Sequence, residues 1–169
     1  TVLALAELST TITGALDPAA GLMAELSTPP LVGALVWVNR LAVTAGSGRT
    51  VTSTPGSVAY AFHLNGHLET GFGWRFGVLR PEVLAALHTT SVRLQGQGAD
   101  EVYASSRWLA DVGPRARLSV FLGAWQVSLS GGAAASLTRE QYRIDPDGVV
   151  FTVPLWAFSS GLSVGRSIP

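Results

Sequence analysis

The chain has 169 residues, eleven Lys+Arg against eleven Asp+Glu, and no Cys. This length suits one domain, predicted here to span residues 1–169, with a core large enough to need no disulfides. The formal net charge of zero excludes a basic nucleic-acid-binding surface, so no specific nucleic acid is expected as a partner. With 47% hydrophobic and 13% charged residues, the composition also excludes disorder.

The residue types that are scarce favour a heat-adapted source. Lys and Cys are absent, Met occurs once, and the only asparagines are Asn39 and Asn65. Asn, Gln, Cys and Met are the thermolabile residues, and thermophilic proteins use few of them. A GC-rich genome would also favour Arg over Lys, and that alternative stays open.

Residues 1–30 are predicted to form an N-terminal arm of mixed character. Val2 to Leu8 could form one apolar helical face, whereas Thr10 to Thr13 is rich in β-branched residues. From Leu31 to Val43 the pattern changes to that of a strand. The arm therefore precedes a region in which we expect strands.

The clearest turn signal is Asn65-Gly66, which lies between the runs Val58 to Leu64 and His67 to Leu79. Asn-Gly favours a two-residue hairpin turn because both residues tolerate a positive φ. In that register Tyr60 and Phe62 share one face, and Phe72, Trp74 and Phe76 share the other. Because both faces are apolar, we expect the second to be covered by another layer or another subunit.

The remaining elements continue the strand pattern after one predicted helix. Pro81 to His88 is predicted as a short helix because Pro and Glu are favoured in the first turn. The uncharged runs Leu118 to Thr138 and Gly148 to Gly165 are long enough to raise the question of a membrane span. Ser, Thr and Gly interrupt them, so we interpret them as strands and turns. Residues 159–169 are predicted to form a C-terminal arm.

Taken together, these elements predict an all-β fold. The expected architecture is a single jelly-roll-like antiparallel β-sandwich or barrel of about eight strands, with one short helix and extended N- and C-terminal arms.

No group of residues indicates catalysis, a cofactor or a metal. Gly161 to Gly165 matches the G-x-S-x-G motif, but no acid or His follows it. His63 and His67 are four residues apart, yet the predicted hairpin points them to opposite faces. Asp145 and Asp147 are explained by their turn. We therefore predict a protein that is not an enzyme, with no catalytic, cofactor-binding or metal-binding residues.

The aromatic residues divide into a predicted core and a predicted interface. Four tryptophans lie in alternating runs and are expected in the core, namely Trp37, Trp74, Trp125 and Trp156. Trp108 is expected to be exposed. A contact surface for other subunits is predicted at Tyr60, Phe62, Phe72, Trp74, Phe76 and Trp108.

The chain resembles the small major capsid proteins of tailless, membrane-containing icosahedral bacteriophages of thermophilic, Thermus-like hosts. The features that carry this resemblance are the length, the strand count, a start at Thr1 without Met, the Arg-only basicity and the lack of catalytic motifs. The resemblance implies a single jelly roll that forms a dimer or larger unit and assembles into a shell. It implies a second, larger capsid protein as partner, an underlying lipid membrane, no cofactor, and a virion location after assembly in the host cytoplasm.

Two functions of other classes stay open. One is a carbohydrate- or surface-binding β-sandwich, which would use an exposed aromatic residue such as Trp108. The other is a β-barrel enzyme or small-ligand carrier with a deep pocket, for example around His63.

Overall fold

A computed structural model describes residues 2–9, 17–52, 58–97, 104–138, 141–144 and 148–166. These residues form strands, turns and short connections, and the all-β prediction is confirmed. No helix among them is long and apolar enough to cross a bilayer. The strands are β1 (Val2–Ser9), β2 (Asp17–Ser27), β3 (Leu35–Thr52), β4 (Val58–Trp74), β5 (Leu79–Gln97), β6 (Ala104–Leu122), β7 (Trp125–Ser136), β8 (Gln141–Ile144), β9 (Gly148–Thr152) and β10 (Trp156–Arg166).

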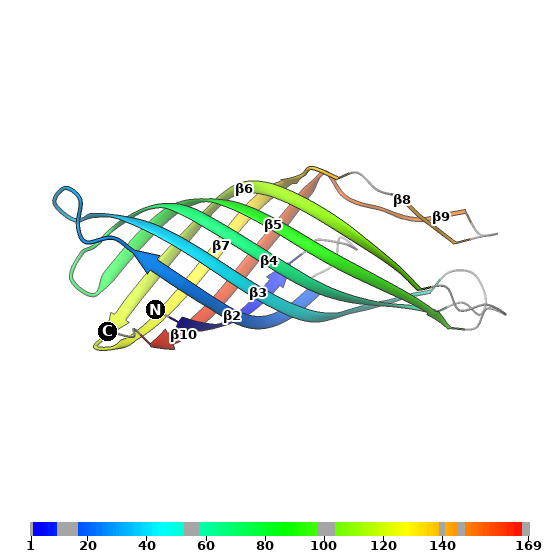
Figure 1. The fold of residues 1–169 in the computed structure, drawn as a ribbon, viewed down its shortest axis with the longest axis horizontal. Helices are drawn as coiled ribbons and strands as arrows, with labels where there is room; N and C mark the ends of the chain where they lie inside the picture. The colour runs from blue at the N-terminus through cyan, green and yellow to red at the C-terminus, as the bar shows by residue number, and fades with distance from the viewer. Residues whose placement is uncertain are drawn as a thin grey trace.

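Eight of these strands close into a barrel (Figure 1). Their order around the barrel is β1, β10, β7, β6, β5, β4, β3, β2, and every neighbouring pair is antiparallel. Strands β1 to β7 therefore follow one another as an up-and-down meander, and β10 closes the gap between β7 and β1. Closure leaves no free sheet edge in the body of the barrel.

The two ends of the barrel differ. At one end short connections join β2 to β3, β4 to β5 and β6 to β7, and both chain termini lie at this end (Figure 1). Each of these connections contains a glycine with positive φ, at Gly33, Gly77 and Gly123. At the other end β3 to β6, with 17 to 19 residues each, extend beyond their shorter neighbours. The separate hairpin of β8 and β9 also lies at this long-strand end.

The burial pattern alternates along the strands whose side chains are described, and it places most of the charged and polar side chains inside, together with a few apolar ones such as Val38 and Leu84. In β5 the side chains of Arg80, Glu82 and His88 are buried, whereas Val83 and Leu87 are exposed. In β6 and β7 the same alternation buries Arg, Ser and Gln and exposes Leu, Val and Trp. A water-soluble barrel would place its apolar side chains inside, so this pattern is inverted.

Close packing between β4 and β5 depends on Gly71. A Cβ at this position would lie 2.2 Å from the Val83 carbonyl oxygen and 2.8 Å from the Leu84 Cα. We expect Gly71→Ala to lower the free energy of unfolding by about 1–3 kcal/mol, because the strands would have to separate. Gly131→Ala is the matched control, since its nearest atom would be the Ser159 carbonyl oxygen at 3.8 Å. Denaturant unfolding of both variants checks this, and equal losses would contradict it.

Several predicted elements are wrong in this fold. The barrel is a meander and not a jelly roll, because successive strands pair with each other around the ring. The predicted arms, residues 1–30 and 159–169, contribute β1, β2 and β10 to the barrel wall. The predicted helix from Pro81 to His88 lies in β5, where pairing with both β4 and β6 overrides the local helix preference.

The predicted hairpin is also wrong, because Asn65-Gly66 lies in the middle of β4. Asn65 is buried and its amide nitrogen donates a hydrogen bond to Thr44 Oγ1 at 3.2 Å. Pairing of Asn65 with Thr44 on one side and Thr90 on the other keeps the backbone extended. His63 and His67 consequently point to the same side, the barrel interior, and not to opposite faces.

Candidate functional site

The interior of the barrel holds a cluster of charged side chains that sequence reasoning missed. We call it the charged plug. Five strands, β2 to β6, contribute its members, and each of them is at most 5% exposed. The members are Glu25, Arg40, Glu69, Arg80, Glu82, Arg115 and Arg117.

Four members of the charged plug form a closed ring of ion pairs. Glu25 pairs with both Arg40, at 2.8 Å, and Arg80. Glu82 likewise pairs with Arg80, at 2.7 Å, and with Arg40. Each carboxylate therefore bridges two guanidinium groups, and each guanidinium bridges two carboxylates. Such pairing offsets the large desolvation penalty of burying charges.

Glu69 joins the ring to the other two arginines. Its Oε2 lies 3.0 Å from Arg117 Nη2, and its Oε1 lies 3.3 Å from Arg115 Nη1. Arg40 Nη1 lies 3.7 Å from the same Oε2, so all seven side chains form one network. Neutral groups add to it from the neighbouring strands, because Gln126 donates to Glu25 and the Ser119 hydroxyl donates to Glu82.

The charged plug closes the lumen at its level. Its side chains project inward from adjacent strands and are almost inaccessible to water. A small eight-stranded barrel is just wide enough for side chains to fill it. In the described part of the chain, the plug therefore leaves no wide aqueous channel.

A second polar layer lies above the charged plug, toward the long-strand end. His67, His88 and Asp111 are directly paired across β4, β5 and β6. The His67 and His88 rings are 4.6 Å apart, and His88 Nδ1 lies 3.0 Å from Asp111 Oδ1. No group of three or more His, Cys, Asp or Glu among the described residues is arranged to hold a metal ion.

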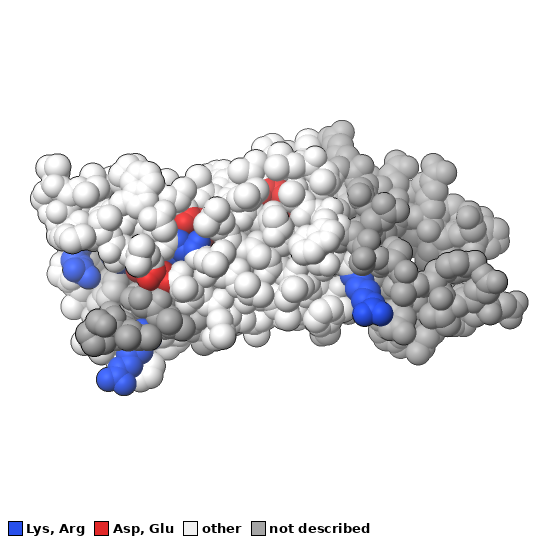
Figure 2. Space-filling view, in the orientation of Figure 1, with Lys and Arg blue, Asp and Glu red and all other residues white. Residues whose placement is uncertain are grey.

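The outer wall carries the apolar side chains. Leu, Val, Phe and Trp dominate its exposed positions, and Figure 2 shows that most of this face is uncharged. The aromatic residues occur at two levels along the strands. Trp74, Phe76 and Trp125 lie near the short-turn end, and Trp156 and Phe158 lie toward the other end. The exposed surface is therefore apolar in the middle and aromatic at two levels.

The predicted interface residues lie on this outer wall where their side chains are described. Phe62, Phe72, Trp74, Phe76 and Trp108 are between 39% and 66% exposed. The side chain of the sixth, Tyr60, lies outside the described residues, although its backbone belongs to β4. The five described side chains therefore lie on the outer wall, and their role as a contact surface for other subunits stays a prediction.

The prediction that four tryptophans form a core is wrong. Trp74, Trp125 and Trp156 are exposed, and Trp37 is half-buried against Phe72 on the outside, with ring centroids 4.7 Å apart. Trp108 is exposed as predicted. Their strands do alternate, but the side that faces the interior is the polar one.

The motifs considered at the sequence level do not form a site. Gly161, Ser163 and Gly165 lie along the inner side of β10, in extended conformation and not in a strand-to-helix turn. Asp145 and Asp147 lie outside the described residues. One signal could have revealed the charged plug and the polar layer above it. Arg80, Glu82 and His88 all occupy even-numbered positions, and therefore one face of a strand, in a run whose other positions are apolar.

Comparisons with known proteins give structural likeness without sequence likeness. No family model matches the chain, and no curated protein matches it in sequence. Ail, the attachment invasion locus protein of Yersinia pestis, solved with the heparin analogue sucrose octasulfate, is 10% identical with a TM-score of 0.60, over 98% of this chain and 96% of that one. A major outer membrane protein from Thermus thermophilus is 9% identical with a TM-score of 0.60, over 99% and 100%. Neisserial surface protein A is 7% identical with a TM-score of 0.51, over 99% and 94%.

These likenesses overturn the resemblance to capsid proteins. The expectations that followed from it are wrong as well: a virion shell, a larger capsid protein as partner, self-assembly as the function, and assembly in a host cytoplasm. Structural similarity at such low identity shows the fold alone. The chain has the antiparallel meander barrel fold that these bacterial outer-membrane and surface proteins share.

Proposed function

We propose that the chain is an integral outer-membrane β-barrel that holds its long-strand end outside the cell and does not act as an open pore. The observation that carries this proposal is the inverted distribution of side chains. Charged groups are buried in the lumen, and large apolar side chains cover the outside. This arrangement is favourable in a lipid bilayer, because the apolar side chains then face hydrocarbon. A closed barrel also satisfies its backbone hydrogen-bonding groups between neighbouring strands.

The height of the apolar wall supports the proposal. Trp125 begins β7, and Trp156 pairs with Ala135 at the other end of the same strand. Ten residues separate Trp125 from Ala135, which at about 3.3 Å per residue and a tilt of about 40° is about 25 Å along the barrel axis. The apolar band of outer-membrane barrels has about this height, with aromatic residues at both margins.

The charged plug supports the second part of the proposal. Water-filled channels of this class occur in much wider barrels of sixteen or more strands. Here eight strands enclose a lumen that Glu25, Arg40 and their partners fill. We propose that the barrel serves as an anchor and a display scaffold, and that it has no catalytic activity.

The orientation follows from the difference between the two ends. Outer-membrane barrels place short turns in the periplasm and longer segments outside the cell. In this chain β3 to β6 and the β8–β9 hairpin extend on the same side, opposite the short turns (Figure 1). The long-strand end is therefore proposed to be the outward one.

Refolding into detergent micelles tests the membrane assignment. We expect the folded chain to migrate differently from the boiled chain in an SDS gel. After transfer into vesicles of lipids brominated along their acyl chains, we expect its Trp fluorescence to be quenched. The exposed positions of Trp74, Trp125 and Trp156 give the physical reason for the quenching. A monodisperse protein that stays folded in buffer without detergent would contradict the proposal.

Planar-bilayer recording tests the closed lumen separately. We expect no steady conductance from the inserted barrel, because the plug leaves no aqueous path. A stable, open channel in the unaltered protein would refute the plug while leaving the membrane assignment intact.

A further inference from the structure

The hydrogen-bonded ladder between β6 and β7 is interrupted at one place. The register pairs Val112 with Ala135 and then Arg115 with Gly132, and it omits the two pairs between them. The register of the two strands is the same on both sides of the gap, so neither strand is bulged or shifted there. The omitted positions on β6 are Gly113 and Pro114.

Pro114 explains the interruption. Proline has no N–H, and in the middle of a sheet it removes one ladder hydrogen bond. Pro114 keeps its pairing with Ala85 on the β5 side, so the donor is missing toward β7, where its partner by register is Ala133. The other prolines of the described strands, Pro18 and Pro81, lie where pairing on one side has already ended.

The two strands remain close together at the interruption. A Cβ on Gly113 would lie 2.0 Å from the Ala133 carbonyl oxygen, so glycine permits this contact. The gap is therefore a missing donor and not a separation of the strands. A carbonyl oxygen that has lost its ladder donor is costly to bury, so we expect another donor to take the place of the missing N–H.

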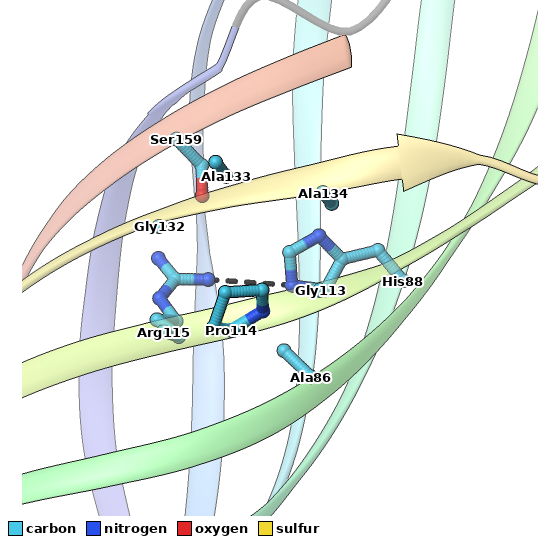
Figure 3. A pocket seen from close by; sticks show the side chains of 9 residues that line it. All are labelled: Ala86, His88, Gly113, Pro114, Arg115, Gly132, Ala133, Ala134 and Ser159. Atoms are coloured by element: carbon cyan, nitrogen blue, oxygen red, sulfur yellow. Dashed lines mark hydrogen bonds between the residues drawn. The ribbon is translucent and has the colours of Figure 1, made fainter. Parts of the chain in front are cut away.

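A small cavity lies directly inside this point (Figure 3). Its volume is about 10 Å³, which is close to the smallest volume that can hold one buried water. Pro114 and Ala133 are among the residues that line it, and so is Gly113, whose Cβ position lies next to the Ala133 carbonyl oxygen. Polar side chains complete the lining, because Figure 3 shows the Ser159 hydroxyl and the Arg115 guanidinium on one side and the His88 ring facing Arg115.

We propose that this cavity binds one water molecule, which donates to the Ala133 carbonyl in place of the N–H that Pro114 lacks. Arg115 and Ser159 supply further polar partners for it, and a buried water usually makes two to four such contacts. The seam between β6 and β7 is then a hydrated weak point of the barrel wall, and local opening starts there. Contact between the outer side of this seam and lipid rests on the proposed membrane function. The water site does not depend on that function.

Amide hydrogen exchange of the refolded barrel in micelles, followed by NMR, tests the proposal. Ala133 and Leu129 lie four residues apart on β7, so their amides point toward the same neighbouring strand, β6. We expect the Ala133 amide to exchange roughly fivefold to tenfold faster than that of Leu129, because its pair has one hydrogen bond fewer. A nuclear Overhauser effect from water to the Ala133 amide is expected in the same sample.

Two variants complete the experiment. Pro114→Ala restores the donor, and it should slow exchange at Ala133 to the level of Leu129 and remove the water signal. Pro81→Ala is the matched control, since the ladder between β4 and β5 begins at Gly73 and Glu82, and it should leave exchange in β4 unchanged. Equal exchange at Ala133 and Leu129 in the unaltered chain, with no water signal, would overturn the proposal even if Pro114→Ala failed to fold. Failure of the membrane assignment would instead show in the gel-shift and quenching experiments.

Discussion

Replacing Leu129 by arginine should lower the free energy of unfolding of the bilayer-embedded protein by about 2–4 kcal/mol. Leu129 is 63% exposed and lies near the middle of β7, between the levels of Trp125 and Trp156. A guanidinium there would enter the hydrocarbon region, which has no water to solvate it. Urea titrations in phospholipid vesicles, with folding read from Trp emission, provide the measurement.

The same substitution at Leu137 is the control. Leu137 is 61% exposed, as Leu129 is, but it lies just beyond the end of β7. We expect a cost of about 0–1 kcal/mol there, because lipid-face charges near the interface are tolerated. In a water-soluble protein both changes would stay within about 0.5 kcal/mol of neutral. Equal, small effects at the two positions would therefore count against membrane embedding.

Glu82→Leu should be the most damaging single change inside the barrel, with an expected loss of about 3–5 kcal/mol. Glu82 bridges Arg40 and Arg80 and accepts a hydrogen bond from Ser119. Its removal leaves two buried guanidinium groups with half of their ring partners. Equilibrium unfolding of the variant in vesicles measures the loss.

A double-mutant cycle distinguishes the ring from separate contacts. Adding Arg80→Met to Glu82→Leu removes one charge of each sign and leaves Arg40 paired with Glu25. We expect the double variant to lose less stability than the sum of the two single variants, by about 1–3 kcal/mol. Strict additivity would show that the four side chains do not act as one network.

The sequence predicted strands but not the direction in which they face. Arg117 to Leu122 and Trp125 to Ser130 alternate, and both became strands. Alternation gives two faces and does not say which one is inside. With water as the solvent, the apolar face is expected to pack in a core, whereas the structure turns the apolar face outward. The surrounding medium, water or lipid, decides which face points inward. The alternation of apolar and polar residues does not reveal that medium.

Local signals misled where long-range pairing was stronger. Asn65-Gly66 has good turn chemistry, and Pro81-Glu82 has good chemistry for a helix start. Both dipeptides lie in strands that pair with neighbours on two sides. Hydrogen bonding along 17 to 19 residues outweighs a local preference of about 1 kcal/mol.

The charged plug could be predicted in part. Arg80, Glu82 and His88 share one face of a run whose other face is apolar, and this parity is visible in the sequence. The pairing of Arg80 with Glu25 and of Glu82 with Arg40 was not visible, because Glu25 and Arg40 lie on other strands and meet β5 only after closure. Conversely, the exposure of Trp108 was predicted correctly, but Trp74, Trp125 and Trp156, which were expected in the core, are exposed as well.

Closure of the barrel also has a kinetic consequence. All pairs of neighbouring strands but one are consecutive in the chain or separated only by the β8–β9 hairpin. These pairs can therefore form between segments that are close together in the sequence. The last seam joins Val2 to Arg166, the first and the last described residues, and its formation carries the largest loss of chain entropy. Until β1 meets β10, two unpaired strand edges remain, which a hydrocarbon environment does not tolerate. Insertion and closure should therefore occur as one concerted, slow event, and a chain that lacks β1 should accumulate as an uninserted intermediate open to aggregation.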